Sequence, residues 1–136
     1  MVGCTAVSDM CPLCASIAAR PLLAFNQHAV AFLDAFPVSP GHVLVVSRRH
    51  VTDLFDLSAD EYAALWGILP DVKAAVQRDH APAGYNVGVN VGPAGGQTVP
   101  HVHVHLIPRY EGDVPDPRGG VRWVLPARAA YWNEHP

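Results

Sequence analysis

Three histidines alternate with valines in one short run of the chain, His101-Val102-His103-Val104-His105. The β-branched residues between them, and Leu106-Ile107 after them, favour a β-strand. Successive side chains of a strand point to opposite faces, so we expect the three imidazoles on one face, with neighbouring Cα atoms about 6.6 Å apart. Imidazole can act as a nucleophile, a proton carrier or a metal ligand near neutral pH. This face therefore predicts a chemical site.

A glycine-rich loop, Gly92-Pro93-Ala94-Gly95-Gly96-Gln97-Thr98, precedes the histidine run. Gly95 and Gly96 allow positive φ angles and a close approach of the backbone to a ligand. Successive amides in such a turn form a nest for an anion, and the Thr98 hydroxyl adds a donor. Alone this loop would read as an ordinary tight turn. Beside three aligned histidines it indicates a phosphate site.

Three stretches of the chain together resemble the histidine triad (HIT) family. They are the histidine run, the glycine loop through Val99, and the upstream block Phe32-Leu33-Asp34-Ala35-Phe36-Pro37-Val38-Ser39-Pro40-Gly41-His42-Val43-Leu44-Val45. The resemblance covers roughly residues 11–109 and leaves 110–136 as a C-terminal tail of one domain over 1–136. It implies a half-barrel sheet, a homodimer, and purine nucleotides as substrates that a histidine attacks at the α-phosphorus.

The resemblance also implies a role for each matching residue. His103 is the expected nucleophile, His105 a hydrogen-bond donor to a phosphate oxygen or the leaving group, and His42 a partner behind His105. Asp34 is expected to grip the ribose hydroxyls, which a carboxylate accepts well. The groups expected to hold phosphate oxygens are Asn90, Gln97, Thr98 and Val99. Phe32 and Leu44 either wall the base or simply pack in the core.

Cys11 and Cys14 form a C-x2-C pair near the N-terminus. Such a pair is half of a metal site, a redox pair or two unrelated cysteines. The redox interpretation expects a βαβ unit, which the surrounding pattern does not supply. The resemblance to the zinc-containing bacterial branch of the family implies His50 and His101 as the other two ligands. Four protein ligands leave no open position, so this zinc would be structural.

The remaining pattern predicts the elements that position these residues. We expect a short helix over 12–19 and strands over 22–25, 29–34, 42–47 and 85–90, the third of them central. Ser58 and Glu61 form a capping box at the start of a long helix with an apolar stripe, which Pro70 should kink or split near Leu69. The prediction is an α+β fold with a five-stranded, mainly antiparallel sheet, one long helix and one or two short ones. The tail is expected to be extended or loop.

Composition limits the function classes. A length of 136 residues fits one domain. Charged residues make up 15% and the net charge is −3, which argues against a nucleic-acid partner. No apolar run is long enough to cross a membrane, and the first residues lack the pattern of a signal peptide. The expected location is the cytoplasm, where the thiols stay reduced.

Three functions are compatible with these residues. The first is a hydrolase or transferase that acts through His103 on dinucleoside polyphosphates or nucleoside phosphoramidates. The second is a metal-dependent hydrolase with His101, His103 and His105 on one ion. Residues at i, i+2 and i+4 of a strand span about 13 Å, so their parallel side chains would struggle to converge at about 2.1 Å from one ion. The third is a regulatory nucleotide-binding protein with little turnover.

Overall fold

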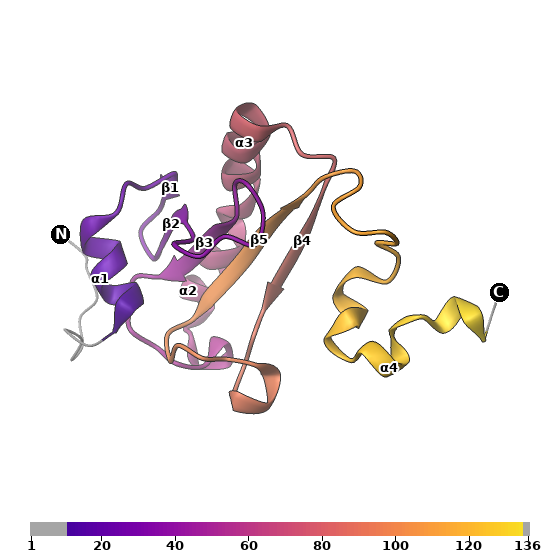
Figure 1. Ribbon diagram of the computed structural model, residues 1–136. Helices are drawn as coiled ribbons and strands as arrows, with labels where there is room; N and C mark the ends of the chain where they lie inside the picture. The colour runs from indigo at the N-terminus through magenta and orange to yellow at the C-terminus, as the bar shows by residue number, and fades with distance from the viewer. Residues whose placement is uncertain (1–10, 135–136) are drawn as a thin grey trace.

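One antiparallel sheet of five strands organises residues 11–134, the part of the chain that this computed structural model describes. The strands are β1 (Ala24–Phe25), β2 (Ala29–Leu33), β3 (Val43–Ser47), β4 (Gly84–Val89) and β5 (His103–Arg109), and their order across the sheet is β1-β2-β3-β5-β4 (Figure 1). Every pairing between neighbours is antiparallel. The expected antiparallel α+β architecture is confirmed, with β3 in the centre.

Two consecutive helices, α2 (Ala59–Gly67) and α3 (Leu69–His80), take the place of the single long helix. Ser58 and Glu61 form the capping box expected at the start of α2. Pro70 lies in the first turn of α3, where its missing N–H costs nothing. The chain therefore breaks at Ile68, next to the kink expected at Leu69. The other α-helices are α1 (Pro12–Ala19) and α4 (Pro126–Ala129), and short 3-10 helices lie at 54–56, 93–95, 120–124 and 131–133.

The central strands are buried on both faces of the sheet. On one face, Val43, Val45 and Val104 pack in a core that also holds Val72 of α3. On the other face, Val46 packs in a second cluster that holds residues of α1. Strands covered on both sides read as continuous apolar runs, which is the pattern of β2 and β3 in the sequence. None of the helices described here combines the length and the hydropathy needed to cross a bilayer.

The strand that carries the histidines begins at His103, two residues later than the sequence pattern suggests. The His101 amide donates to the Val99 carbonyl at 2.8 Å, and the Val102 amide donates to the Val51 carbonyl at 2.8 Å. These bonds hold the chain in a bend before the ladder of β5 starts. His101 therefore precedes the strand, so the expected start of the strand is wrong by two residues, and of the three histidines only His103 and His105 share a face of β5.

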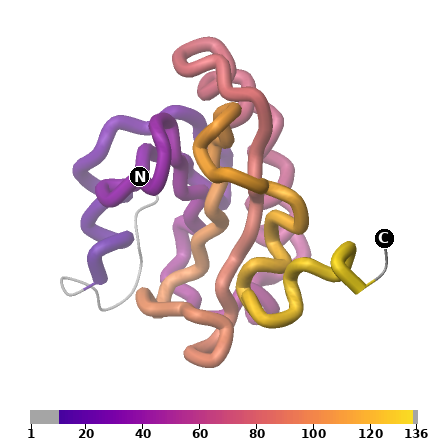
Figure 2. Tube along the Cα trace, turned by 45° about the vertical axis from the view of Figure 1, so that its right-hand side comes forward, coloured from indigo at the N-terminus to yellow at the C-terminus, as the bar shows by residue number. Residues whose placement is uncertain are grey.

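The tail folds into short helical turns beyond the outer edge of β4 (Figure 2). The Arg122 side chain links two of these turns, because its guanidinium donates to the carbonyls of Arg128 and Ala129 at 2.8 and 3.1 Å. The expectation of an extended or irregular tail misses these turns. These turns are held by side-chain contacts, which a local sequence pattern does not predict.

Candidate active site and metal group

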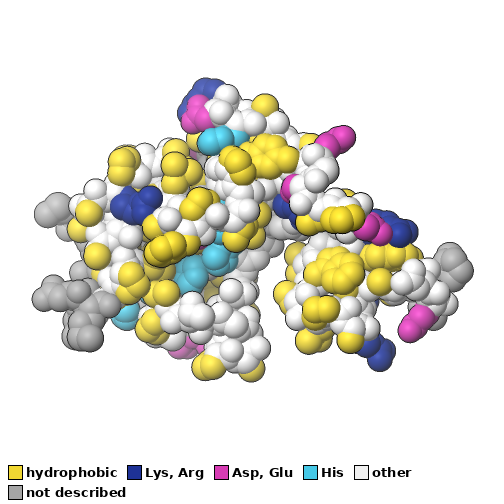
Figure 3. Space-filling view, in the orientation of Figure 1, with side chains coloured by type: hydrophobic (Ala, Val, Ile, Leu, Met, Phe, Trp, Pro, Cys, Tyr) yellow, Lys and Arg dark blue, Asp and Glu magenta, His cyan; other side chains and the backbone are white. Residues whose placement is uncertain are grey.

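A cavity of about 330 Å³ opens on the face of the sheet that α1 partly covers. Register places Phe32 of β2 beside Leu44 of β3, and Leu44 beside His105 of β5. The next row places Val46 beside His103. The floor of the cavity is therefore apolar under β2 and β3 and carries imidazoles under β5. Histidine side chains reach the surface near the middle of one face of the molecule (Figure 3).

His103 presents an unprotonated nitrogen to this cavity. Its side chain is buried to within 8% exposure, and its Nδ1 lies 2.7 Å from the His101 carbonyl oxygen. A carbonyl only accepts hydrogen bonds, so Nδ1 carries the proton of the neutral ring. The lone pair then lies on Nε2. The backbone thereby selects the tautomer that a nucleophile requires.

His105 presents the opposite character, a donor. The Val38 amide donates to Nδ1 of His42 at 3.1 Å, so the proton of neutral His42 is on Nε2. That Nε2 lies 2.9 Å from Nδ1 of His105 and donates to it. The proton of His105 is then on Nε2. The rings of His103 and His105 lie 5.1 Å apart, which places an acceptor and a donor side by side.

Burial keeps both supporting imidazoles neutral. It lowers the pKa of His105 to about 4, helped by neighbouring His103 and His42. Burial also lowers the pKa of His42, although the carboxylate of Asp34 opposes the effect. Asp34 Oδ2 lies 3.5 Å from His42 Nε2. At neutral pH the rings of His42 and His105 are therefore neutral, and His105 offers a hydrogen bond and not a positive charge.

Five further expected residues line the same cavity: Phe32, Leu44, Asn90, Thr98 and Val99. Asp34 also lines it and is fixed by its own loop, because its Oδ1 accepts from the Phe36 amide at 2.9 Å. The glycine loop closes over Asn90, and Gly96 there has a φ of +92° and lies close to the Asn90 side chain. That left-handed conformation favours glycine at this position.

Gln97 lies outside the cavity lining and braces the loop. Its Oε1 accepts from the Gly92 amide at 2.9 Å, and its Nε2 donates to the carbonyls of Thr52 and Val99 at 2.8 and 3.1 Å. Its backbone amide donates to the Gly92 carbonyl. The structure therefore assigns Gln97 to holding the shape of the loop, while Thr98 and Val99 face the cavity.

One side of α1 also lines the cavity, which the sequence reasoning missed. Pro12, Ser16 and Arg20 recur every four residues, so they share a helix face that extends one residue beyond the last turn. Leu13 lines the cavity as well. Once a helix is predicted over 12–19, that spacing is a usable signal. What the sequence alone does not reveal is which strands the face covers.

Cys11, Cys14, His50 and His101 come together at the N-terminal end of α1, with their ligand atoms within 4.8 Å of one another. Nδ1 of His101 lies 3.5 Å from both sulfurs, and Nδ1 of His50 lies 3.3 Å from the Cys14 sulfur. The edges of a tetrahedron around zinc with sulfur and nitrogen ligands are about 3.6 Å. The donor set and its spacing therefore fit a metal ion.

The backbone also prepares His101 as a ligand. Its Nε2 lies 2.7 Å from the Ser47 carbonyl oxygen, so the proton is on Nε2 and the lone pair of Nδ1 faces the sulfurs. His101 is fully buried. The single-ion arrangement of His101, His103 and His105 does not occur, because His101 faces this group while His103 faces the cavity.

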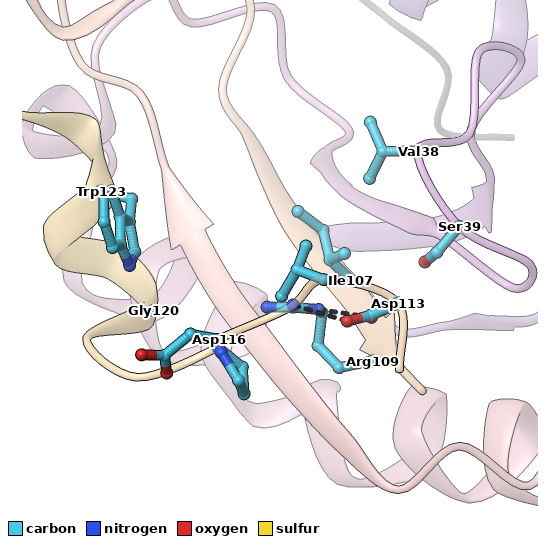
Figure 4. A pocket seen from close by; sticks show the side chains of 10 residues that line it. Val38, Ser39, Ile107, Arg109, Asp113, Asp116, Gly120 and Trp123 are labelled. Atoms are coloured by element: carbon cyan, nitrogen blue, oxygen red, sulfur yellow. Dashed lines mark hydrogen bonds and ion pairs between the residues drawn. The ribbon is translucent and has the colours of Figure 1, made fainter. Parts of the chain in front are cut away.

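A second, larger cavity of about 530 Å³ lies between the end of β5 and the tail (Figure 4). Arg109 lines it and pairs with Asp113 at 2.8 and 2.9 Å. Trp123 lies on the opposite side of the cavity (Figure 4). No histidine lines this cavity among the described residues. The chemistry therefore places the candidate active site in the smaller one, despite its size.

The sequence comparisons agree with this site. Residues 18–112 match the family model described as HIT domain. The bis(5'-nucleosyl)-tetraphosphatase (asymmetrical) of Schizosaccharomyces pombe is 40% identical over 85 residues, which cover 62% of this chain and 47% of that protein. The matching parts amount to 46–61% of the length of the first curated relatives, so the chain aligns with only about half of each.

Solved structures share the fold, and one of them is described as zinc-bound. A HIT family protein from Bacillus anthracis is 35% identical, with a TM-score of 0.69 over 78% of this chain and 77% of that one. A zinc-bound histidine triad family protein from Mycobacterium smegmatis is 28% identical, with a TM-score of 0.67 over 93% of this chain and 98% of that one.

Proposed function

This chain belongs to the histidine triad (HIT) family, and from that premise we propose that it cleaves purine nucleotides at the α-phosphorus through a nucleotidyl-His103 intermediate. The observation that carries the proposal is the set of hydrogen bonds from which the tautomers of His103 and His105 follow. In the assigned tautomers Nε2 of His103 has a free lone pair, and Nε2–H of His105 is a donor on a ring whose centre lies 5.1 Å from that of His103. A nucleophile beside a donor for the leaving group is the arrangement that covalent catalysis needs.

The chemistry runs in two displacements. The Nε2 lone pair of His103 attacks the α-phosphorus, the bond to the leaving group breaks, and its electrons go to the leaving oxygen or nitrogen. Water then attacks the same phosphorus and loses a proton to the solvent, the phosphorus–Nε2 bond breaks with its electrons returning to Nε2, and the nucleoside monophosphate leaves. Asn90, Thr98 and Val99 line the cavity. In this proposal the side chains of the first two and the backbone of Val99 donate to the phosphoryl oxygens while negative charge builds there.

The neutral state of His105 favours one substrate class. A polyphosphate departs as an anion and needs only a hydrogen bond, whereas the amine of a phosphoramidate must take up a proton. His105, with its pKa lowered to about 4 by burial, donates a hydrogen bond but carries no extra proton at neutral pH. We therefore place dinucleoside polyphosphates ahead of nucleoside phosphoramidates. The yeast relative named as a tetraphosphatase supports this order.

Three further parts of the proposal rest on the family. Zn²⁺ is the metal that Cys11, Cys14, His50 and His101 would hold, and a closed four-ligand site gives it a structural role. The protein is proposed to act as a homodimer, which sedimentation velocity tests. A cytoplasmic location is proposed as well, and microscopy of the tagged full-length protein tests it.

Trapping the intermediate tests the reaction. The protein is mixed with diadenosine tetraphosphate, quenched in neutral denaturant because phosphohistidine bonds are acid-labile, and analysed by intact and peptide mass spectrometry. We expect one nucleotidyl adduct on His103, lost in His103→Asn and retained in His105→Asn with slower formation. Turnover without any adduct, or an adduct that survives His103→Asn, would refute the mechanism. Binding without turnover would instead favour the regulatory alternative.

A further inference from the structure

We propose that Arg20 reads the base of the bound nucleotide and makes the site prefer 6-oxopurines, guanine above all, over adenine. This inference rests on the proposed nucleotide site and assigns its base specificity. It concerns the one lysine or arginine side chain that lines the cavity among the described residues.

The backbone and the guanidinium of Arg20 are held in place, but the N–H donors of its side chain are unused. Its amide closes the end of α1 by donating to the Ser16 carbonyl at 2.9 Å, and its Cζ lies 5.9 Å from the centre of the Phe32 ring. Within residues 11–134 its guanidinium forms no hydrogen bond or ion pair. Cation–π attraction orients a guanidinium over a ring while leaving its N–H groups free to donate.

The register of the sheet places Arg20 at the base end of the site. Phe32, Leu44 and His105 form one row across three adjacent strands, so Phe32 lies about 10 Å from His105. The α-phosphorus must contact the imidazoles of β5, and the ribose separates it from the base. The base then lies over the apolar floor of β2 and β3, with its edge toward the guanidinium above Phe32.

The chemistry of the purine edge turns this placement into specificity. Guanine presents two acceptors, O6 and N7, that match two parallel N–H donors of arginine. Adenine keeps the N7 acceptor but presents an amino donor at position 6, which faces the guanidinium as donor against donor. Hypoxanthine has the same O6 and N7 as guanine. An arginine at this edge therefore discriminates by the group at position 6.

Binding measurements test the proposal without any turnover. Calorimetry with GMP, IMP and AMP is run on the wild type, Arg20→Ala and Arg20→Gln. We expect the wild type to bind GMP and IMP about tenfold or more tightly than AMP, the discrimination of one bidentate contact. Arg20→Ala should remove that ratio. Arg20→Gln should reverse it, because a glutamine amide matches N6 and N7 of adenine.

Arg48→Ala is the matched control. Arg48 also lies 5.9 Å over a phenylalanine ring, that of Phe25, but does not line the cavity, so its removal should leave the ratio unchanged. Equal affinities of the wild type for GMP and AMP, or equal losses for all three nucleotides in Arg20→Ala, would overturn the proposal, the second outcome indicating a phosphate contact. A ratio that depends on Arg20 would stand even if His103 formed no adduct.

Discussion

His101 and His103 are the same residue type, two positions apart, and they serve different sites. A backbone carbonyl makes the difference in each case. The Ser47 carbonyl accepts from Nε2 of His101 and turns its Nδ1 toward the cysteines. The carbonyl of His101 itself accepts from Nδ1 of His103 and turns its Nε2 toward the cavity. In each ring, the nitrogen that donates to a backbone carbonyl carries the proton, so the other nitrogen keeps a lone pair for a metal ion or for nucleophilic attack.

The two sites are also mechanically connected through that second bond. His101 contributes its side chain to the metal group and its carbonyl oxygen to the nucleophile. A metal ion that fixes the His101 ring would therefore also fix the acceptor that selects the tautomer of His103. The metal group is thus expected to support catalysis only by holding structure, while the cavity performs the reaction.

We expect the largest effects from replacing His103 and His101, each by asparagine, because the two variants should lose different properties. His103→Asn should lower kcat by about a thousandfold or more, as for other nucleophiles, with nearly unchanged thermal stability. His101→Asn should lose the metal and several kcal/mol of stability while the folded fraction retains an intermediate that mass spectrometry detects. Turnover, metal content and thermal melting are measured on both proteins. Similar stability losses in the two variants would erase the distinction between the sites.

Metal removal tests the structural side alone. Zinc binding to a four-ligand site is folding free energy for its ligands, so a chelator should lower the melting temperature of the reduced protein by about 10 °C or more. Elemental analysis of freshly purified protein should return one zinc per chain. Cys11→Ser provides the control, since its melting temperature should already be low and insensitive to the chelator. Protein that contains no metal and melts identically with chelator would contradict the zinc assignment.

Much of the fold could be predicted because its signals are local. Continuous apolar runs mark β2 and β3, alternating valines and histidines mark β5, and Ser58 with Glu61 marks the start of α2. The start of β5 two residues after His101 could not be predicted, because it depends on hydrogen bonds to the carbonyls of Val99 and Val51.

The candidate site divides in the same way. Residues inside the family's motifs, such as Asp34 and Thr98, line the cavity as expected. Arg20 was missed because it lies outside every motif, and only the packing of α1 on the sheet brings it to the cavity. Gln97 was placed at the phosphate by analogy, although its amide is taken up by the loop.

Substitution of His42 is expected to lower kcat less than substitution of His103 does. His42→Ala removes the donor to Nδ1 of His105, so the proton of His105 is no longer fixed on Nε2. We expect kcat to fall about 10²-fold, within the range for positioned proton donors, with KM little changed. His42→Gln should recover part of the loss, because its amide can donate in place of Nε2–H. Equal activities of the alanine and glutamine variants would mean that His42 merely fills space.

Substitution of Glu61 is expected to have the smallest effect on stability, and it tests a contact next to the metal ligand His50. Its carboxylate receives two hydrogen bonds from Arg49, the residue before His50, at 2.8 and 2.9 Å. That pairing lowers the pKa of Glu61 to about 2, with burial working against it. Glu61→Gln should therefore cost about 1 kcal/mol at neutral pH, since solvent screens the half-exposed Arg49 partner, and leave kcat unchanged.

The sign of its pH dependence follows from the lowered pKa. The folded state favours the charged form of Glu61 more than the unfolded chain does, because the pKa of Glu61 is near 4.5 in the unfolded chain and about 2 in the folded protein. The stabilisation is complete above that value and is lost as the pH falls toward 2. Urea titrations at pH 7 and pH 3 should show a smaller difference between wild type and Glu61→Gln at the lower pH. Asp116→Asn, which breaks the exposed pair with Arg118 in the tail, should change neither titration. If both variants behaved alike, the Arg49–Glu61 pair would hold His50 no better than a surface pair does, and the metal group would depend on its ligands alone.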